Sequence, residues 1–210
     1  MSLRQLVALA AALPCVALAH GSDEPRAIPG LVPVGAYSTG LGAEGAESIS
    51  IRAHDGLAAL TNIAGSVDLL DLSDPAAPTL VRRIPVDTTA GAPNSVALHP
   101  EKDYLLVVTG RSGSEGRILA YGLDGTLLAS APAGIQPDSI AFGPGGRYAV
   151  VANEAEGVAV GNDGGAGSLT LVDLDGFSAR HPRLRVRQVP LPSAAGIPGF
   201  STGRTDDLAR

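Results

Sequence analysis

Several residue types are scarce in this sequence, and each scarcity excludes a class of protein. Its 210 residues include one cysteine, no tryptophan and only 3% aromatic residues. A disulfide-stabilised fold is excluded, and the core has to be built from valine, isoleucine, leucine and alanine. Basic residues are outnumbered, with 15 Lys and Arg against 21 Asp and Glu. The net charge of −6 argues against a nucleic-acid-binding protein, which needs a basic face to neutralise phosphates.

Helical and membrane-spanning patterns are also missing after the first 20 residues. Glycine (27 residues) and proline (16 residues) interrupt the chain so often that no heptad pattern continues, which excludes a coiled coil. No second long apolar stretch follows the one at the N-terminus, which excludes a multi-pass membrane protein. The other apolar residues fall in short stretches between turn residues, as in an all-β protein.

Residues 1–19 are predicted to be a secretory signal peptide. Arg4 supplies a positive start, Leu6–Leu18 is a short apolar stretch, and Ala17 and Ala19 are the small residues expected before a cleavage site. A membrane anchor is the alternative, although the apolar stretch is short for a span. Cleavage after Ala19 predicts a periplasmic or secreted protein with no membrane span in the mature chain.

The residues around the predicted cleavage site add two details. Cys15 raises the alternative of a lipoprotein, but Pro14 stands where a small residue is wanted. The mature chain would contain no cysteine, and hence no thiolate metal site and no cysteine nucleophile. Residues 20–30 are expected to be a flexible segment. His20, as the new N-terminus, offers an amine and an imidazole to copper, although a flexible setting disfavours such a site.

Three repeats organise residues 31–192. They begin near residues 47, 94 and 138, and their opening serines are 47 and 44 residues apart. Each repeat contains four short strands separated by turns, which is typical of a β-propeller blade. A β-sandwich is the alternative, because it also shows turns at regular spacing. The predicted strands are 48–51, 57–60, 66–72 and 79–86, then 95–98, 104–108, 117–121 and 126–131, then 139–142, 148–152, 168–174 and 184–191.

We therefore predict an all-β fold, a β-propeller of four-stranded antiparallel blades. About three blades are present, with a further strand-like stretch at 31–37 and an irregular tail at 193–210. Propellers close with roughly four to eight blades, so an incomplete ring is expected. Its open edges invite pairing with another chain, and further blades or self-association are predicted to cover them.

Five stretches of the sequence form a recognisable series, namely Asn94-Ser95-Val96-Ala97, Pro137–Phe142, Gly145–Tyr148, Ala152–Glu156 and Gly167–Leu174. Together they resemble the choice-of-anchor I domain, a secreted bacterial β-propeller related to YVTN/LVIVD-type repeats. The resemblance covers about residues 30–174, and Ala155 stands where the family usually has glycine. Family members are generally longer, and some are labelled as alkaline phosphatases or are fused to phosphoesterase domains.

Oxygen-bearing side chains recur at one position of the repeats. Glu47, Asn94 and Asp138 each precede the predicted innermost strand of a repeat. Because the start of one antiparallel strand and the end of the next share an edge, residues that end the second strands should face the same end of the propeller. These are Asn62, Thr109 and Asn153, and the loop after the last of them carries Glu154, Glu156, Asn162 and Asp163.

These residues predict a Ca²⁺ site formed by Glu47, Asn94, Asp138, Asn153, Glu154 and Glu156, because Ca²⁺ prefers such oxygen ligands. The alternative is turn chemistry, since Asn and Asp bond their own backbone at strand ends. Calcium should raise the melting temperature, and Asp138→Ala with Glu154→Ala should abolish that rise. No other cofactor is predicted.

Other motifs are weaker. Gly40–Gly45 matches a dinucleotide fingerprint as a string, but a strand follows it where a helix is needed. Stretches 162–165 and 173–176 lack the spacing of an EF-hand and are interpreted as turns. His54 and His99 are predicted at comparable turns, too few ligands for a metal site. Arg183, Arg185 and Arg187 alternate along a strand, where they are expected to protect an outer edge, or alternatively to bind an anionic polymer.

No catalytic residues are predicted, and no Gly-x-Ser-x-Gly elbow occurs. The first functional hypothesis is an extracytoplasmic binding or scaffold module with an unknown extracellular ligand or protein partner, acting through its acidic channel face. The alternative is a calcium-assisted hydrolase of phosphate or carboxylic esters.

Overall fold

The computed structural model describes residue 30, residues 32–155 and residues 167–191. The chain divides into two compact units, Met1–Pro33 and Val34–Arg210. The predicted signal peptide and tail lie outside the described residues, as does nearly all of segment 20–30. Within the described part of the chain, no helix has the length and apolar character needed to cross a membrane.

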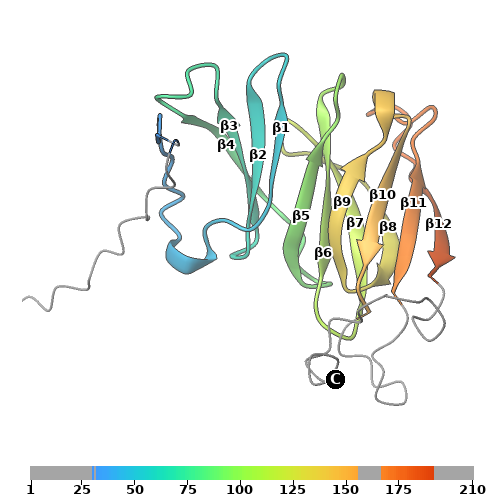
Figure 1. The fold of residues 1–210 in the computed structure, drawn as a ribbon. Coiled ribbons are helices and arrows are strands. Elements are labelled where there is room, and N and C mark those ends of the chain that lie inside the picture. Colours follow the sequence, from blue (N-terminus) through green and yellow to red (C-terminus); the bar gives the residue numbers. More distant parts are fainter. Residues whose placement is uncertain (1–29, 31, 156–166, 192–210) are drawn as a thin grey trace, which may run out of the picture. The chain divides into compact units, whose positions relative to one another are not determined.

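Within the described residues, twelve strands form three antiparallel sheets of four strands each (Figure 1). Each sheet corresponds to one repeat, and we call the sheets blades 1, 2 and 3. Blade 1 contains β1 (Ile49–Arg52), β2 (Leu57–Asn62), β3 (Ser66–Asp71) and β4 (Thr79–Pro85). Blade 2 contains β5 (Ala92–Leu98), β6 (Tyr104–Gly110), β7 (Glu115–Gly122) and β8 (Leu127–Ile135). Blade 3 contains β9 (Pro137–Phe142), β10 (Tyr148–Asn153), β11 (Ser168–Asp173) and β12 (Arg185–Pro190).

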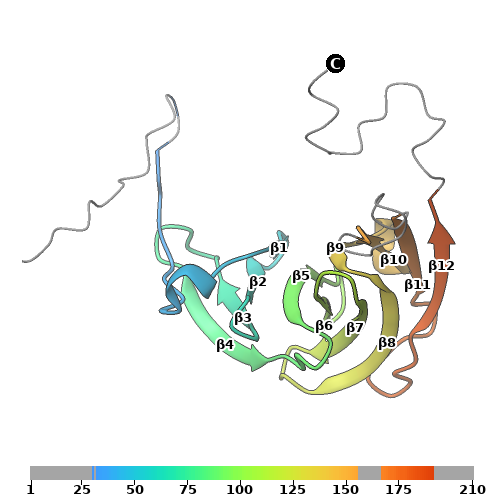
Figure 2. The same ribbon diagram turned by 90° about the horizontal axis from the view of Figure 1, so that it is seen from below.

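Consecutive strands pair in every blade, and the blades stand side by side with their first strands innermost (Figure 2). Contacts between β1, β2 and β5, and between β5, β6 and β9, join each blade to the next. The predicted propeller architecture is therefore confirmed, and all twelve predicted strands form, with ends that differ from the prediction by up to four residues. Turn residues at the predicted positions end each strand, which explains why the strands are so short.

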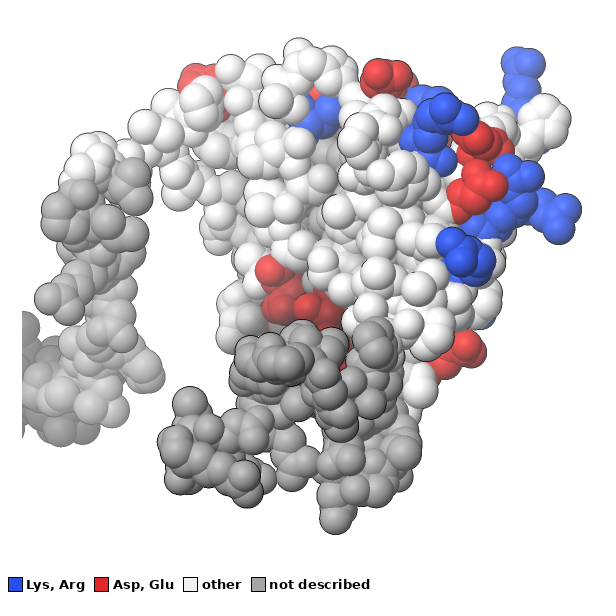
Figure 3. Space-filling model, turned by 45° about the vertical axis from the view of Figure 1, so that its right-hand side comes forward, with Lys and Arg blue, Asp and Glu red and all other residues white. Residues whose placement is uncertain are grey.

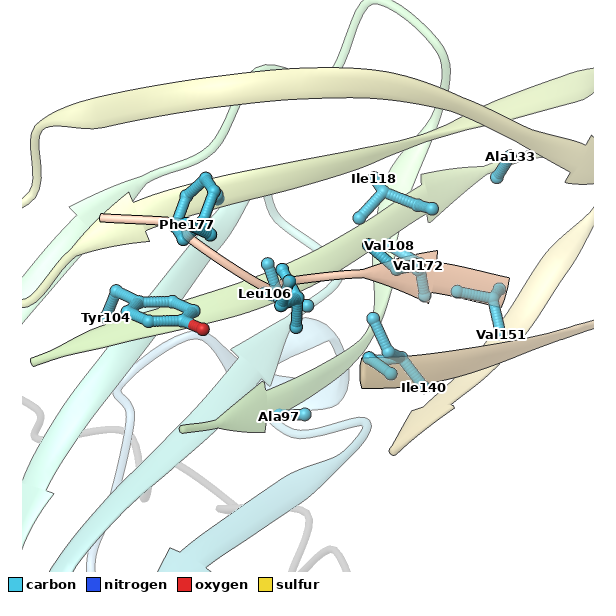
Figure 4. Close-up of a cluster of buried hydrophobic side chains, with 13 residues drawn as sticks. Ala97, Tyr104, Leu106, Val108, Ile118, Ala133, Ile140, Val151, Val172 and Phe177 are labelled. Atoms are coloured by element: carbon cyan, nitrogen blue, oxygen red, sulfur yellow. The ribbon is translucent and has the colours of Figure 1, made fainter. Parts of the chain in front are cut away.

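Two apolar clusters fill the spaces between blades. The cluster between blades 1 and 2 includes Leu69, Ile84 and Leu105, each almost fully buried. The cluster between blades 2 and 3 is larger and is drawn in Figure 4. Every residue of β6 is buried, because blade 2 has a neighbour on both faces. Burial of one such side chain contributes about 1.5–3 kcal/mol, so blade packing is the main source of stability.

The structure differs from the sequence prediction at two places. The prediction of a strand-like stretch at 31–37 is wrong for the described residues 32–37, which form no strand. One reason is Pro33, which lacks the N–H group that a strand ladder needs. Strand β8 extends to Ile135, four residues beyond its predicted end, and Gln136 alone connects it to β9. Gln136 has φ +50°, so the chain reverses direction within a single left-handed residue.

Candidate functional site

A β-bulge places Asn94 and Asp138 at the same position of their blades. Pro93 pairs with Thr109 and Ser95 with Val108, which leaves Asn94 as the extra residue. In blade 3, Pro137 and Ser139 pair with consecutive residues of β10, which leaves Asp138 as the extra residue. Bulges redirect a side chain out of the regular alternation, and they recur beside functional sites.

Glu47 occupies the corresponding position of blade 1. Its backbone N–H donates to the Thr61 carbonyl oxygen at 3.0 Å, and the Thr61 N–H donates to the Ser48 carbonyl at 2.9 Å. Glu47 and Ser48 therefore both lie opposite Thr61, next to the end of β2. The structure thus brings the three predicted residues to the same end of their sheets. Glu47 and Asp138 are exposed, whereas Asn94 is partly buried and donates from Nδ2 to the Pro137 carbonyl at 2.8 Å.

Asn153 is a structural residue in the space between blades 2 and 3. Its Nδ2 lies 3.1 Å from Ser168 Oγ and 3.0 Å from Thr170 Oγ1, and its Oδ1 accepts a hydrogen bond from the Gly134 N–H at 3.1 Å. The side chain is 3% exposed. Its polar atoms are used to join β10 to β11 and to blade 2.

The counterparts of Asn153 in the other blades are also buried. Asn62 donates from Nδ2 to Ser66 Oγ at 3.0 Å, and its Oδ1 has no hydrogen-bond partner among the described residues. The hydroxyl of Thr109 likewise has none in the described part of the chain. Both side chains are fully buried. Asn62 and Thr109 lie at the predicted end of their blades, but their side chains are buried in the protein interior and are not on its surface.

Glu154 and Ala155 continue the connection between blades. Glu154 is exposed and accepts a hydrogen bond from Gln136 Nε2 at 3.1 Å. Ala155 has φ +57° in the left-handed region, and its N–H donates to the Ile135 carbonyl at 3.1 Å. This conformation explains why glycine suits the position in the choice-of-anchor I family.

Glu156, Asn162 and Asp163, predicted for the same face, lie outside the described residues. Over residues 32–155 and 167–191, no three His, Cys, Asp or Glu side chains gather closely enough to hold a metal ion. The Ca²⁺ site therefore stays a prediction. The described residues contribute to it only exposed carboxylates and amides already engaged in hydrogen bonds.

A groove of about 790 Å³ runs along the inner strands β1, β5 and β9. Serine hydroxyl groups connect these strands where no backbone ladder exists. Ser48 Oγ lies 3.2 Å from Ser95 Oγ, which also accepts a hydrogen bond from the Ile140 N–H. Ser50 Oγ accepts one from the Leu98 N–H at 3.0 Å. The groove is lined mainly by serine, glycine and apolar residues, together with Arg52 and His54, and no carboxylate is among its lining residues.

Arg52 closes one end of this groove, and the sequence analysis had not identified it. Its guanidinium donates to Asp55 Oδ2 at 2.6 Å and to the Lys102 carbonyl at 2.9 Å, so it joins blade 1 to a turn of blade 2. The side chain is 7% exposed. Hydrogen bonding to Asp55 raises the pKa of Arg52, and the same contact lowers the pKa of Asp55. Arg52 is therefore a permanent cation that is already neutralised.

His99 is the counterpart of Arg52 in blade 2, not of His54 as predicted. Arg52 is the last residue of β1 and His99 directly follows β5, so both lie at the end of an innermost strand. His54 is exposed in the turn after β1. His99 is 1% exposed, and its Nδ1 accepts hydrogen bonds from the N–H groups of Glu101 and Lys102. Burial lowers the pKa of His99, so its neutral form is favoured.

A second pocket, of about 770 Å³, lies on the face of blade 3 that points away from blade 2. Figure 3 brings this side of the molecule forward and shows basic and acidic side chains gathered at one margin of a largely uncharged surface. Arg185 and Arg187 share one face of β12, the outer edge strand, whereas Arg183 precedes the strand. Arg185 forms an ion pair with Asp173 at 2.9 Å. The predicted position on an outer edge strand holds for Arg185 and Arg187 and is wrong for Arg183.

The remaining glycine-rich motifs are turns. Gly42–Glu44 forms a single 3₁₀ turn, which is too short to present amide groups to a dinucleotide as the fingerprint requires. Asp173 accepts a hydrogen bond from the Asp175 N–H at 2.9 Å, and Gly176 has φ +77°. This is the geometry of a tight turn between strands, as predicted.

Solved structures similar to this chain are much larger proteins. Hydrazine synthase of Kuenenia stuttgartiensis matches with a TM-score of 0.53 and 14% identity over 70% of this chain and 37% of that protein. A putative 6-phosphogluconolactonase of Bacteroides fragilis matches with a TM-score of 0.52 and 18% identity over 70% and 40%. A second one, of Bacteroides uniformis, matches with a TM-score of 0.52 and 18% identity over 70% and 41%.

This chain spans about two fifths of the length of these structures, and at such low identity the likeness shows the β-propeller fold alone. No curated protein matches the sequence. The sequence profile of the choice-of-anchor I domain, however, matches residues 47–193, a range that includes all three blades. The chain belongs to the choice-of-anchor I domain family.

Proposed function

We propose that this chain is an extracytoplasmic β-propeller module that acts by binding, and that its ligand occupies the groove along β1, β5 and β9. The observation that carries the proposal is the groove itself. Its volume of about 790 Å³ is in the range of small-molecule and peptide sites, and strands of all three blades line it. The predicted signal peptide of residues 1–19 and the secreted or surface character of the family support a location outside the cytoplasm.

The lining of the groove indicates an uncharged ligand. Hydroxyl groups and apolar side chains alternate along β1, where Ser48 and Ser50 alternate with the exposed Ile49 and Ile51. The cation at one end, Arg52, is neutralised by Asp55, so it adds little attraction for an anion. A neutral sugar chain or an extended peptide fits hydroxyl and apolar contacts of this kind. The hydrogen bonds of the groove serines Ser48, Ser50 and Ser95 are to another hydroxyl or to backbone N–H groups, not to a base, and no observation favours the hydrolase alternative.

A reporter dye tests the proposal. The chain from His20 onward has no cysteine, so Ser139→Cys in the groove and Ser73→Cys in an outer turn can each carry one environment-sensitive dye. Neutral oligosaccharides, synthetic peptides, phosphate and CaCl₂ are titrated in turn. We expect a saturable response to a neutral probe at position 139 only. Equal responses at both positions, or turnover of phosphate or carboxylic esters that Ser139→Cys abolishes, would contradict the proposal.

A further inference from the structure

The connection between β5 and β6, residues 99–103, is held in place by the side chain of its first residue, and we call it the His99 turn. His99 Nδ1 accepts hydrogen bonds from the N–H groups of Glu101 at 3.0 Å and Lys102 at 2.9 Å. An imidazole nitrogen accepts a hydrogen bond only while it carries no proton. The conformation of the turn therefore requires that His99 is neutral.

The His99 turn also supplies the partners of Arg52 on blade 2. Arg52 Nη1 donates to the Lys102 carbonyl oxygen at 2.9 Å and lies 3.5 Å from the His99 carbonyl oxygen, and Nη2 lies 3.4 Å from Asp103 Oδ1. Among the described residues, each hydrogen bond from Arg52 to blade 2 ends in this turn. A change in the turn would leave the nearly buried guanidinium with Asp55, on its own blade, as its remaining partner.

The imidazole ring of His99 also packs against blade 3. A Cβ on Gly146 would lie 2.3 Å from Nε2, and the centroid of the Phe142 ring lies 5.1 Å from that of the imidazole. Rotation of the ring by half a turn would place the carbon Cδ2 where Nδ1 stands, and carbon offers no acceptor. A protonated ring therefore loses both hydrogen bonds to the turn in either orientation, and it moves away only if the contact with blade 3 changes.

The charges near His99 oppose its protonation on balance. Burial is the largest influence and lowers the pKa of His99, as does the positive charge of Lys102 and, more weakly, that of Arg52. The carboxylate of Glu101 and a hydrogen bond to the backbone of Gly146 act in the opposite direction. The charged and titratable groups around the ring are Glu101 and Lys102 on its own turn, Tyr104 on β6, and Arg52 on β1 with Asp55 and Asp103 beyond it, whereas Phe142 and Gly146 of blade 3 carry no charge.

We propose that His99 is an acid-sensitive switch: when its imidazole takes up a proton, the His99 turn leaves the conformation described above, and Arg52 loses its partners on blade 2 while the strands stay folded. We call the two conformations of the turn closed and open. Arg52 and Pro100 line the groove along β1, β5 and β9, so the change of the turn alters the shape of the groove there. No ligand is needed for this change, and it does not depend on the proposed function.

The direction of the pH dependence follows from the two environments of the imidazole. In the open turn His99 is in water, where its pKa is about 6.5. In the closed turn its pKa is lower, so the open form takes up the proton first as the pH falls. The closed turn is therefore fully favoured above about pH 6.5. Below that pH the ratio of open to closed turn rises up to about tenfold per pH unit, until the pH reaches the pKa of the closed form.

Amide hydrogen exchange followed by NMR tests the switch directly, because the N–H groups of Glu101 and Lys102 are the donors to Nδ1. Rates are measured between about pH 7.5 and 5.5 and divided by the rate of an unfolded peptide at the same pH. We expect the protection of both amides to fall up to about tenfold per pH unit below about pH 6.5. The Val107 amide, inside the fully buried strand β6, reports unfolding of the whole chain and should stay roughly tenfold or more better protected.

Three variants separate the steps of the proposal. His99→Asn keeps an acceptor for the two N–H groups but does not titrate, so the protection of the Lys102 amide should no longer change with pH. His181→Gln, at an exposed position, is the matched control and should keep the change. Arg52→Gln removes the guanidinium that holds the Lys102 carbonyl oxygen, so it should lower the protection of the Lys102 amide at every pH and keep the pH dependence.

Proteolysis of the folded protein provides a second measurement. Lys102 is the only lysine in the sequence, so a lysine-specific protease cuts the chain only in the His99 turn. Relative to a lysine-containing peptide, cleavage should accelerate below about pH 6.5 by the same factor as exchange, while circular dichroism stays unchanged. Equal protection of the Lys102 and Val107 amides at every pH would show that the turn opens only with the whole chain, and would overturn the proposal. Protection of Lys102 that is constant with pH, or that still falls in His99→Asn, would overturn it as well.

Discussion

The carboxylate of Asp68 on β3 is fully buried and forms an ion pair with two hydrogen bonds to the guanidinium of Arg83 on β4. Arg83 Nε lies 2.6 Å from Oδ1 and Nη2 lies 2.8 Å from Oδ2. The Tyr37 hydroxyl donates to Oδ2 at 2.9 Å, and Arg83 Nη2 donates to the Thr39 carbonyl at 2.8 Å. Bonding to Asp68 raises the pKa of Arg83, while burial and then Asp68 raise the pKa of Tyr37. One ion pair thus fixes the N-terminal segment to blade 1.

Asp68→Asn should destabilise the protein and release this segment. The substitution keeps the size of the side chain but removes the charge that Arg83 and Tyr37 bind, and hydrogen bonds to a charged group contribute about 1.5–3 kcal/mol. Since Arg83 is 36% exposed and is partly solvated after the change, we expect a loss of about 2 kcal/mol in urea unfolding. Asp71→Asn, an exposed change on the same strand, is the control. Equal losses for both variants would contradict the role of the pair.

His99 should make the free energy of unfolding depend on pH between about pH 6.5 and 5. Burial lowers its pKa in the folded protein, so the unfolded chain takes up the proton first as the pH falls. The stabilisation is fully present above the unfolded pKa of about 6.5 and is lost progressively below it. We expect the free energy of unfolding to fall between pH 6.5 and 5 with a slope approaching about 1.4 kcal/mol per pH unit.

His99→Asn should remove that slope. The Asn side-chain oxygen can accept the Glu101 and Lys102 N–H groups as Nδ1 does, but it does not titrate. The variant loses the ring contacts with Tyr104 and Phe142, so it should be less stable at pH 8 yet flat between pH 6.5 and 5. The exposed His181→Gln serves as the control and should retain the slope. Carboxylates with lowered pKa, such as Asp55 and Asp175, titrate at lower pH and do not interfere.

The strands could be predicted from sequence because blade packing leaves a repeated local pattern. β6 and β10 read as continuous apolar stretches, and turn residues such as His99-Pro100 and Gly145-Gly146 bound them. Register followed from the recurring serines, so the shared position of Asn94 and Asp138 was also predictable. The bulge that produces this position needs a pairing partner, and pairing is not visible in one strand alone.

The detailed use of each polar side chain could not be predicted. Asn153 and Asn62 occupy the same repeat position, yet only Asn153 has a preceding blade whose Gly134 satisfies it. The Asp68–Arg83 pair joins residues 15 apart across two strands, and neither residue belongs to a motif. Sequence reasoning therefore grouped oxygen-bearing residues by position, whereas burial decides which of them are structural.

Gly146 and Gly145 form a natural pair for a test of backbone and packing effects. Both have positive φ, at +68° and +71°, so alanine at either position costs about 1 kcal/mol of backbone strain. A Cβ on Gly145 would meet nothing within 4 Å, whereas a Cβ on Gly146 would collide with the ring of His99. Gly146→Ala should therefore cost about 1–3 kcal/mol more than Gly145→Ala in urea unfolding. Equal costs would show that the His99 ring moves freely.

Thr109 and Asn153 hold the same place in blades 2 and 3, and substitutions there should have opposite signs. Asn153→Ala removes the bonds to Ser168, Thr170 and Gly134 and leaves the partly buried Gly134 N–H unpaired, so we expect a loss of about 2–3 kcal/mol. Thr109→Val replaces a fully buried hydroxyl that has no partner among the described residues by a methyl group of similar size. Removal of an unpaired polar group should leave stability unchanged or raise it by about 1 kcal/mol. Urea midpoints of the two variants measure both effects, and a marked loss for Thr109→Val would reveal a hydrogen-bond partner for that hydroxyl.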